Sequence, residues 1–145
     1  MNPKVIIDTS YLLPIFGVEV KTKIKLIDIL RSYIEIYYNP ISLVEIKWVL
    51  YRIVRRGLLP LDEARKSYRE GLDVLFRDKR FRQTSLTSSS IEEIADKLED
   101  LGLRDYFDRL IAATAIAGEY KLITEDKELI KILKDDYRYV ILENI

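Results

Sequence analysis

Short apolar runs alternate along the chain with longer segments in which apolar residues recur at helical spacing. The runs are rich in β-branched and aromatic residues, as buried strands are. They predict strands at residues 4–8, 34–38, 81–86, 121–124 and 137–142. The segments between them repeat apolar residues every three to four positions, which predicts amphipathic helices. These helices cover residues 26–33, 42–56, 61–75, 90–101, 106–117 and 127–133.

Strands that alternate with helices predict βαβ units and an α/β fold with a parallel sheet. The predicted helix starts carry capping residues, with a capping box at Ser42 and Glu45, another at Ser90 and Glu93, and a single cap at Asp105. A chain of 145 residues that is 48% hydrophobic can build one core, and no low-complexity linker divides it. We therefore expect a single domain over residues 1–145.

The composition of the chain bears on its cellular location. The longest apolar runs are too short to cross a membrane, and the N-terminal run ends in a carboxylate, unlike a signal peptide. The chain has no Cys, so we expect a cytoplasmic protein with no membrane partner.

Charge is distributed unevenly, although 24 Lys and Arg balance 24 Asp and Glu. Residues 46–82 hold eleven basic residues against five acidic ones, whereas residues 92–108 hold seven acidic residues against two basic ones. Such a pair of segments could guide a polyanion towards a metal site. Solvated helix faces give the same pattern, and from charge alone we favour that interpretation.

Candidate chemistry lies in four acidic residues, because a chain without His or Cys is limited to carboxylates, hydroxyls, Lys and Arg. Asp8 and Asp126 follow predicted strands, while Glu45 and Asp108 lie in the predicted first turns of helices. Ligands of parallel sheets bind beyond the carboxyl ends of the strands, where these four could meet. Clustered carboxylates need a cation, and hard ions such as Mg²⁺ or Mn²⁺ prefer oxygen ligands.

Each acid also has a structural interpretation. Asp8 could accept hydrogen bonds from turn amides, and Glu45 could complete its capping box with Ser42. Asp108 would be favoured by the helix macrodipole, and Asp126 could cap the last helix. Taken singly, both interpretations are equally supported, but the joint pattern favours a functional cluster.

Four segments carry a family resemblance: Val-Ile-Ile-Asp-Thr-Ser-Tyr-Leu-Leu at 5–13, Ser-Leu-Val-Glu at 42–45, Asp-Arg-Leu-Ile-Ala-Ala-Thr-Ala at 108–115 and Leu-Ile-Thr-Glu-Asp-Lys at 122–127. In this order they resemble the PIN domain, and within it the VapC-type ribonucleases of toxin–antitoxin pairs. The last two segments are the most specific. Residues 55–82 form a longer and more basic stretch than the minimal family pattern, which leaves the substrate and partner open.

The resemblance implies a three-layer α/β/α sandwich with a central five-stranded, mainly parallel sheet. It assigns the four acids as catalytic residues and as ligands of Mg²⁺ or Mn²⁺: Asp8, Glu45, Asp108 and Asp126. It gives supporting roles to three hydroxyl residues: Thr9, Ser10 and Thr124. We expect Asp126 to act through water or a second ion. The resemblance also implies a VapB-like antitoxin partner and a homodimer.

The expected activity is endonucleolytic cleavage of single-stranded RNA that leaves 5′-phosphate and 3′-hydroxyl ends. Two alternatives stay open: an RNA-maturation or structure-specific nuclease of the same fold, and a non-catalytic binding module of that fold. Trp48 and Arg52 lie off the apolar stripe of the 42–56 helix and would suit a partner interface. Trp48 fits a core position equally well, and we favour the core.

Overall fold

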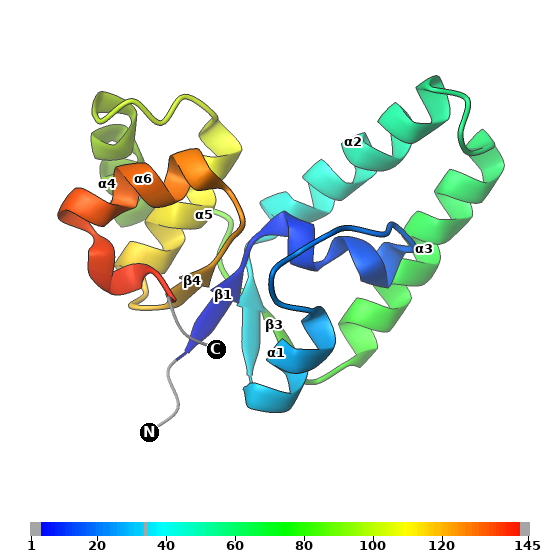
Figure 1. Ribbon diagram of the computed structural model, residues 1–145, viewed down its shortest axis with the longest axis horizontal. Helices are drawn as coiled ribbons and strands as arrows, with labels where there is room; N and C mark the ends of the chain where they lie inside the picture. The colour runs from blue at the N-terminus through cyan, green and yellow to red at the C-terminus, as the bar shows by residue number, and fades with distance from the viewer. Residues whose placement is uncertain (1–3, 34, 143–145) are drawn as a thin grey trace.

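The computed structural model describes residues 4–33 and 35–142, and its elements are labelled in Figure 1. Four short strands form one sheet: β1 (Val5–Ile7), β2 (Ile36–Tyr38), β3 (Phe81–Gln83) and β4 (Lys121–Ile123). Six α-helices lie within the described ranges: α1 (Leu26–Ser32), α2 (Ile41–Arg55), α3 (Leu61–Arg77), α4 (Ser89–Asp100), α5 (Tyr106–Ala117) and α6 (Lys127–Asp136). Three 3-10 helices join them: η1 (Thr9–Tyr11), η2 (Leu13–Phe16) and η3 (Arg138–Val140).

The sheet has the order β3-β2-β1-β4, and its neighbouring strands are parallel throughout. The strand β1 is fully buried because its side chains, which point alternately to the two faces of the sheet, pack into a core on each face. Val5 and Ile7 join a core with residues of α1, α2 and α3, whereas Ile6 joins a second core with residues of α4, α5 and α6. Figure 1 shows these two groups of helices on either side of the sheet, which is the predicted three-layer arrangement.

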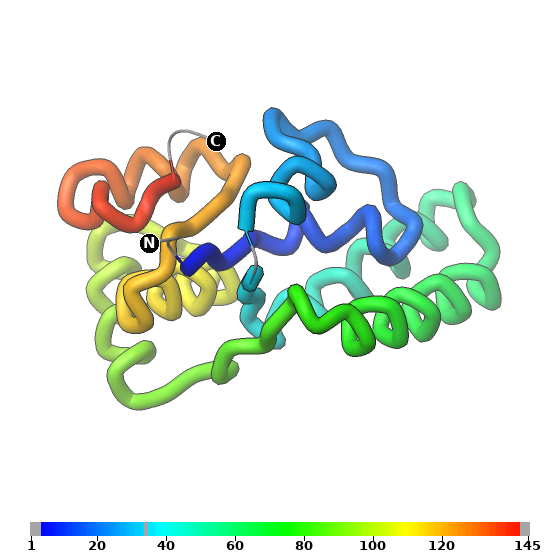
Figure 2. Tube along the Cα trace, turned by 90° about the horizontal axis from the view of Figure 1, so that it is seen from below, coloured from blue at the N-terminus to red at the C-terminus, as the bar shows by residue number. Residues whose placement is uncertain are grey.

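The helices α2 and α3 run side by side as a hairpin that projects beyond the sheet, as both Figure 1 and Figure 2 show. Gly57 has a φ of +74°, which lets the chain turn between them without the steric cost of a side chain. Gly71 of α3 lies against the ring of Phe16, and a Cβ there would come within 2.3 Å of the ring. This close contact fixes η2 and the chain after β1 against the hairpin.

The predicted fifth strand over residues 137–142 is wrong. Residues 138–140 form η3 instead, and Ile141 makes only one parallel bridge, to Leu122. The sequence Tyr-Arg-Tyr-Val has strong β propensity, but local hydrogen bonds from Val140 to Tyr137 and from Ile141 to Arg138 satisfy the backbone there. The turn also buries Val140 in the core with α4, α5 and α6.

Other boundaries differ by a few residues. The strand predicted over 81–86 ends at Gln83, since the carbonyls of Ser85 and Leu86 accept hydrogen bonds from the Asn39 side chain instead. Ser88, rather than Ser90, caps α4. The first residue of the strand predicted over 34–38 lies outside the described residues. Within the described ranges, the helices are too short or too polar to cross a membrane.

Candidate active site

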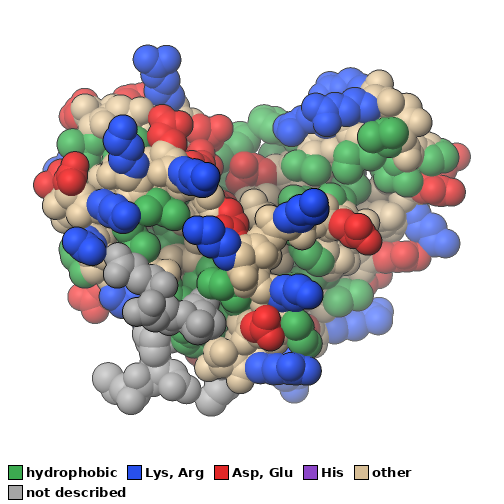
Figure 3. Space-filling view, in the orientation of Figure 1, with side chains coloured by type: hydrophobic (Ala, Val, Ile, Leu, Met, Phe, Trp, Pro, Cys, Tyr) green, Lys and Arg blue, Asp and Glu red, His purple; other side chains and the backbone are tan. Residues whose placement is uncertain are grey.

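A cleft of about 620 Å³ opens at the carboxyl ends of the parallel strands. It separates the α2–α3 hairpin from the group formed by α4, α5 and α6, and Figure 3 shows acidic side chains gathered in this hollow. Its walls come from the ends of β1 and β4 and from the helices α2 and α5. The lining residues are Asp8, Thr9, Ser10, Leu13, Glu45, Trp48, Val49, Arg52, Asp105, Phe107, Asp108, Glu125 and Asp126.

Asp8 is held in place by its neighbours on two adjacent strands. Its amide continues the β1–β4 ladder by donating to the Ile123 carbonyl at 3.0 Å. Its Oδ1 accepts from the Thr9 amide at 2.7 Å, and its Oδ2 accepts from the Thr124 hydroxyl at 2.7 Å. Burial raises the pKa of Asp8 above its ordinary value, although these two hydrogen bonds oppose the shift. The carboxyl is therefore oriented before any ligand binds.

Glu45 does not form the predicted capping box with Ser42. The helix α2 begins at Ile41, one residue earlier than expected, and Asn39 Oδ1 accepts from the Ile41 amide. Glu45 therefore lies in the second turn, with Oε1 2.7 Å from the Thr9 hydroxyl, which is also 2.8 Å from Ser42 Oγ. Burial is the main cause that raises the pKa of Glu45 to about 7, and repulsion from Asp8 adds to it.

Asp108 lies in the first turn of α5, as predicted, and Asp105 caps that helix. Asp105 Oδ1 accepts from the amides of Phe107 at 2.8 Å and Asp108 at 3.1 Å. Burial, followed by repulsion from Asp105 and Asp8, raises the pKa of Asp108 to about 8. Repulsion from Asp126 and Glu45 contributes as well. The other carboxyls are thus close enough to Asp108 to disfavour its charged form.

Asp126 combines both interpretations that the sequence allowed. It caps α6 by accepting from the Leu129 amide at 3.1 Å, and it also lines the cleft. Its own amide donates to the Thr124 hydroxyl oxygen at 3.1 Å. The intervening Glu125 accepts from the Tyr11 hydroxyl at 2.9 Å and from the Lys23 amide. Hydrogen bonds therefore hold this loop in place around Asp126.

The structure brings all four predicted acids to one cleft, together with Thr9 and Ser10. Thr124 lies behind Asp8 rather than on the cleft surface. Sequence reasoning did not place seven of the lining residues at the cleft: Leu13, Trp48, Val49, Arg52, Asp105, Phe107 and Glu125. Asp105 was recognisable in the sequence as the cap of the helix that carries Asp108. The start of that helix faces the cleft, so Asp105 could have been expected there as well. Phe107 and Glu125 had no comparable signal.

The prediction that Trp48 belongs to the core is wrong. Its side chain is 52% exposed, and it lies on the cleft wall. Its ring centroid is 5.2 Å from that of Phe107, with the planes tilted by 39°. Because Phe107 comes from α5, which is distant in sequence, the helical pattern around Trp48 could not reveal this pairing.

The basic stretch contributes little to the cleft itself. Among the eleven Lys and Arg of residues 46–82, Arg52 is the one that lines it. Arg80 pairs with Asp78 within its own turn, and Arg82 pairs with Glu35. The interpretation of this stretch as mainly solvated helix faces therefore describes the structure better than a continuous basic track.

The donor groups at the cleft fit a hard divalent ion that keeps much of its water. Within residues 4–33 and 35–142, no three acidic side chains lie close enough together to hold one ion between them. Mg²⁺ is commonly held by one or two carboxylates, with water and substrate phosphate completing its coordination. Burial and repulsion raise the pKa values of Glu45 and Asp108, and such a cation would stabilise their charged forms.

Comparison with known proteins identifies one family. The family model described as the PIN domain matches residues 5–134, from β1 into α6. No curated protein matches the chain. The matched range contains all four candidate acids and both walls of the cleft.

Proposed function

The chain belongs to the PIN-domain family, whose members are generally nucleases, and from this premise we propose that it is a metal-dependent endoribonuclease acting on single-stranded RNA. One observation carries the proposal: four carboxyl groups from four separate segments line one cleft at the sheet edge. They are Asp8, Glu45, Asp108 and Asp126. Such a cluster of negative charges is unfavourable unless a bound cation neutralises it.

In this proposal Asp8, Glu45 and Asp108 contact the ion directly or through water, and Asp126 acts through water or a second ion. Nucleases of this family generally use divalent metals such as Mg²⁺. When bound, the ion would lower the pKa of a water molecule and neutralise charge on the phosphate oxygens. The carboxyls themselves are positioned by other side chains of the protein.

Hydroxyl groups keep the carboxyls in position. Thr124 and the Thr9 amide each occupy one oxygen of Asp8, so the carboxyl cannot rotate freely. The Thr9 hydroxyl donates to Oε1 of Glu45, which also lines the cleft. One short segment after β1 therefore orients two acids from different elements, and this pre-organisation lowers the cost of gathering ligands on binding.

The same premise supports a narrower role. The segments at 5–13, 42–45, 108–115 and 122–127 resemble VapC-type ribonucleases, so we propose a toxin of a VapBC-type pair. A VapB-like antitoxin and a homodimer then follow as proposed partners. The chain contains no His, which removes a His-pair mechanism through a cyclic phosphate, so products with 5′-phosphate and 3′-hydroxyl ends are expected.

The test is cleavage of a single-stranded RNA by the purified protein with Mg²⁺ or Mn²⁺, and again with a chelator. The proposal expects cleavage with either ion, none with the chelator, and 5′-phosphate ends. A duplex of the same sequence serves as the control substrate and should be cut far more slowly. RNA binding without cleavage under every condition would instead support a non-catalytic binding module.

A further inference from the structure

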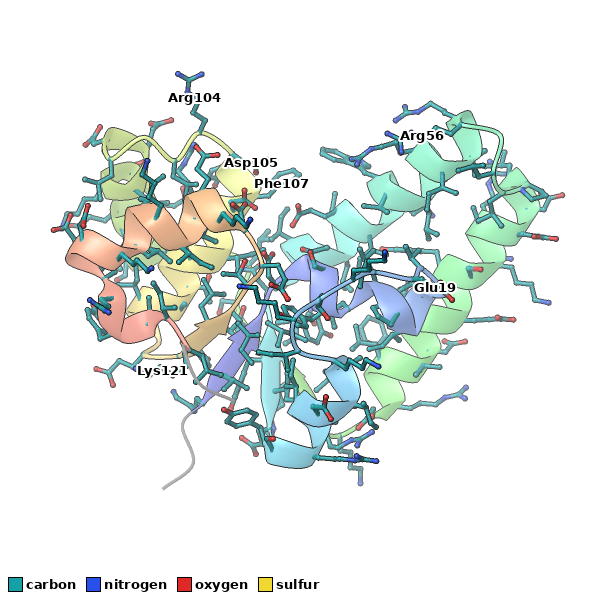
Figure 4. The ribbon with its side chains drawn as sticks, in the orientation of Figure 1. Glu19, Arg56, Arg104, Asp105, Phe107 and Lys121 are labelled. Atoms are coloured by element: carbon teal, nitrogen blue, oxygen red, sulfur yellow. The ribbon has the colours of Figure 1, made fainter. Side chains whose placement is uncertain are left out.

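An aromatic pair, Trp48 and Phe107, lies on the cleft wall. Trp48 is the chain's single Trp, yet 52% of its side chain is exposed. It contacts Phe107 across the cleft at a centroid distance of 5.2 Å. Figure 4 shows Phe107 at the start of α5, on the side that faces α2. The pair therefore joins the wall from α2 to the wall from α5 and leaves much of the indole uncovered.

The order of residues along α2 places this pair between acid and cation. Glu45, Trp48 and Arg52 lie at positions i, i+3 and i+7, so they share one helical face, and all three line the cleft. Along the axis, Trp48 is about 4.5 Å and Arg52 about 10.5 Å beyond Glu45, at 1.5 Å per residue. A chain entering the cleft would meet a guanidinium, then an aromatic surface, then carboxyls.

The charges favour nucleic acid as the occupant. Arg52 has no ion-pair partner within the described parts of the chain, so its guanidinium is available to a phosphate. The acidic residues of the cleft repel phosphates and offer little affinity for RNA by themselves. An aromatic surface supplies affinity that does not depend on charge, because every nucleobase presents a π face. Bases in a duplex are already stacked and could not use it.

We propose that Trp48, supported by Phe107, stacks on an unpaired nucleobase next to the scissile phosphate, while Arg52 contacts the backbone further out. The inference rests on the proposed nuclease function and adds to it the reason for single-strand preference. The platform is a binding surface for substrate, and the carboxyls remain the reacting centre. Its loss should therefore raise KM and leave kcat nearly unchanged.

The first experiment uses the fluorescence of Trp48, which no other indole in the chain obscures. The wild-type protein is titrated in chelator with a single-stranded RNA oligomer, with the matching duplex, and with a sugar-phosphate oligomer that lacks bases. The proposal expects quenching by the single strand alone. Equal quenching by all three, or quenching by none, would overturn it.

The second experiment compares cleavage by Trp48→Ala, Trp48→Phe and the control Phe76→Ala with metal ions present. Phe76 is an exposed aromatic on α3 that does not line the cleft. Loss of one stacked base predicts a KM roughly 5- to 150-fold higher for Trp48→Ala. Trp48→Phe should recover much of this loss, and Phe76→Ala should resemble the wild type.

The outcomes separate this inference from the proposed function. If the wild type cleaves RNA and Trp48→Ala has an unchanged KM, the platform is refuted while the nuclease function stands, and the pair is better explained as a protein interface. If the wild type neither binds nor cleaves RNA, both are refuted.

Discussion

The Thr124 hydroxyl donates a 2.7 Å hydrogen bond to Oδ2 of Asp8, which links the ends of the neighbouring parallel strands β4 and β1. The same hydroxyl oxygen accepts from the Asp126 amide at 3.1 Å. One side chain thus forms hydrogen bonds with two acidic residues, one after each of the two strands. Its geometry explains how a threonine away from the cleft surface can influence the proposed metal site.

Replacing Thr124 tests this connection. Thr124→Val keeps the shape but leaves buried Asp8 Oδ2 without its donor and the Asp126 amide without its acceptor. We expect the free energy of unfolding to fall by about 1–3 kcal/mol, measured by urea denaturation. Thr124→Ser retains the hydroxyl and should lose much less. Equal stability of the two variants would show that the hydrogen bond contributes nothing.

The metal-free protein should become less stable as pH rises from 5 to 8. The pKa of Asp108 is raised from 3.8 to about 8 and that of Glu45 from 4.5 to about 7, chiefly by burial. Between these limits the folded state binds more protons than the unfolded state, so the free energy of unfolding falls with pH. Thermal unfolding in the presence of a chelator, measured from pH 5 to 8, gives the slope of stability against pH.

Asp108→Asn provides the matched variant for that slope. The amide cannot ionise, so this protein should show a flatter pH dependence and a higher melting temperature than the wild type at pH 8. Asp96→Asn removes an exposed carboxyl on α4 and should keep the wild-type slope. A wild-type stability that rises between pH 5 and 8 would contradict the burial argument.

Glu45→Gln separates charge from hydrogen bonding. The amide oxygen can still accept from the Thr9 hydroxyl, which is 2.7 Å from Oε1, so the fold should be retained. A neutral amide binds a hard divalent ion poorly, and we expect RNA cleavage to fall roughly tenfold or more. Circular dichroism checks the fold and a fluorescent RNA checks the rate. Full activity in a folded variant would remove Glu45 from the proposed site.

Arg52→Gln should alter the salt dependence of RNA binding. If Arg52 contacts one phosphate, the slope of log K against log salt becomes shallower by about 1. The control is Arg31→Gln, which removes a charge on α1 away from the cleft. Identical slopes for both variants would show that Arg52 does not meet the RNA backbone.

The sequence predicted those parts of the fold that local patterns determine. The apolar spacing of residues 106–117 matches α5, and Asp105 caps that helix as expected. The order of strands and helices also predicted the parallel sheet edge at which Asp8 and Asp126 lie. These features depend on periodicity and capping within one segment, which a single sequence displays directly.

Features that depend on contacts between distant segments were not predictable in the same way. Ser42 and Glu45 have capping-box spacing, yet both lie near Thr9, because the chain after β1 packs onto the start of α2. Trp48 lies on the cleft wall, where it contacts Phe107 of α5, rather than in the core. The strand expected at 137–142 is reduced to one bridge because a 3-10 turn at the sheet edge buries Val140.

The most direct test of the central claim is the rate at which purified Asp8→Asn cleaves single-stranded RNA in Mn²⁺, measured beside the wild type. The Asn oxygen can still accept from the Thr9 amide, so the fold should survive. We expect a well-folded variant whose cleavage rate is lower by roughly 100-fold or more. A folded Asp8→Asn that cleaves RNA as fast as the wild type would contradict the account, because the activity would then not come from the acidic cleft.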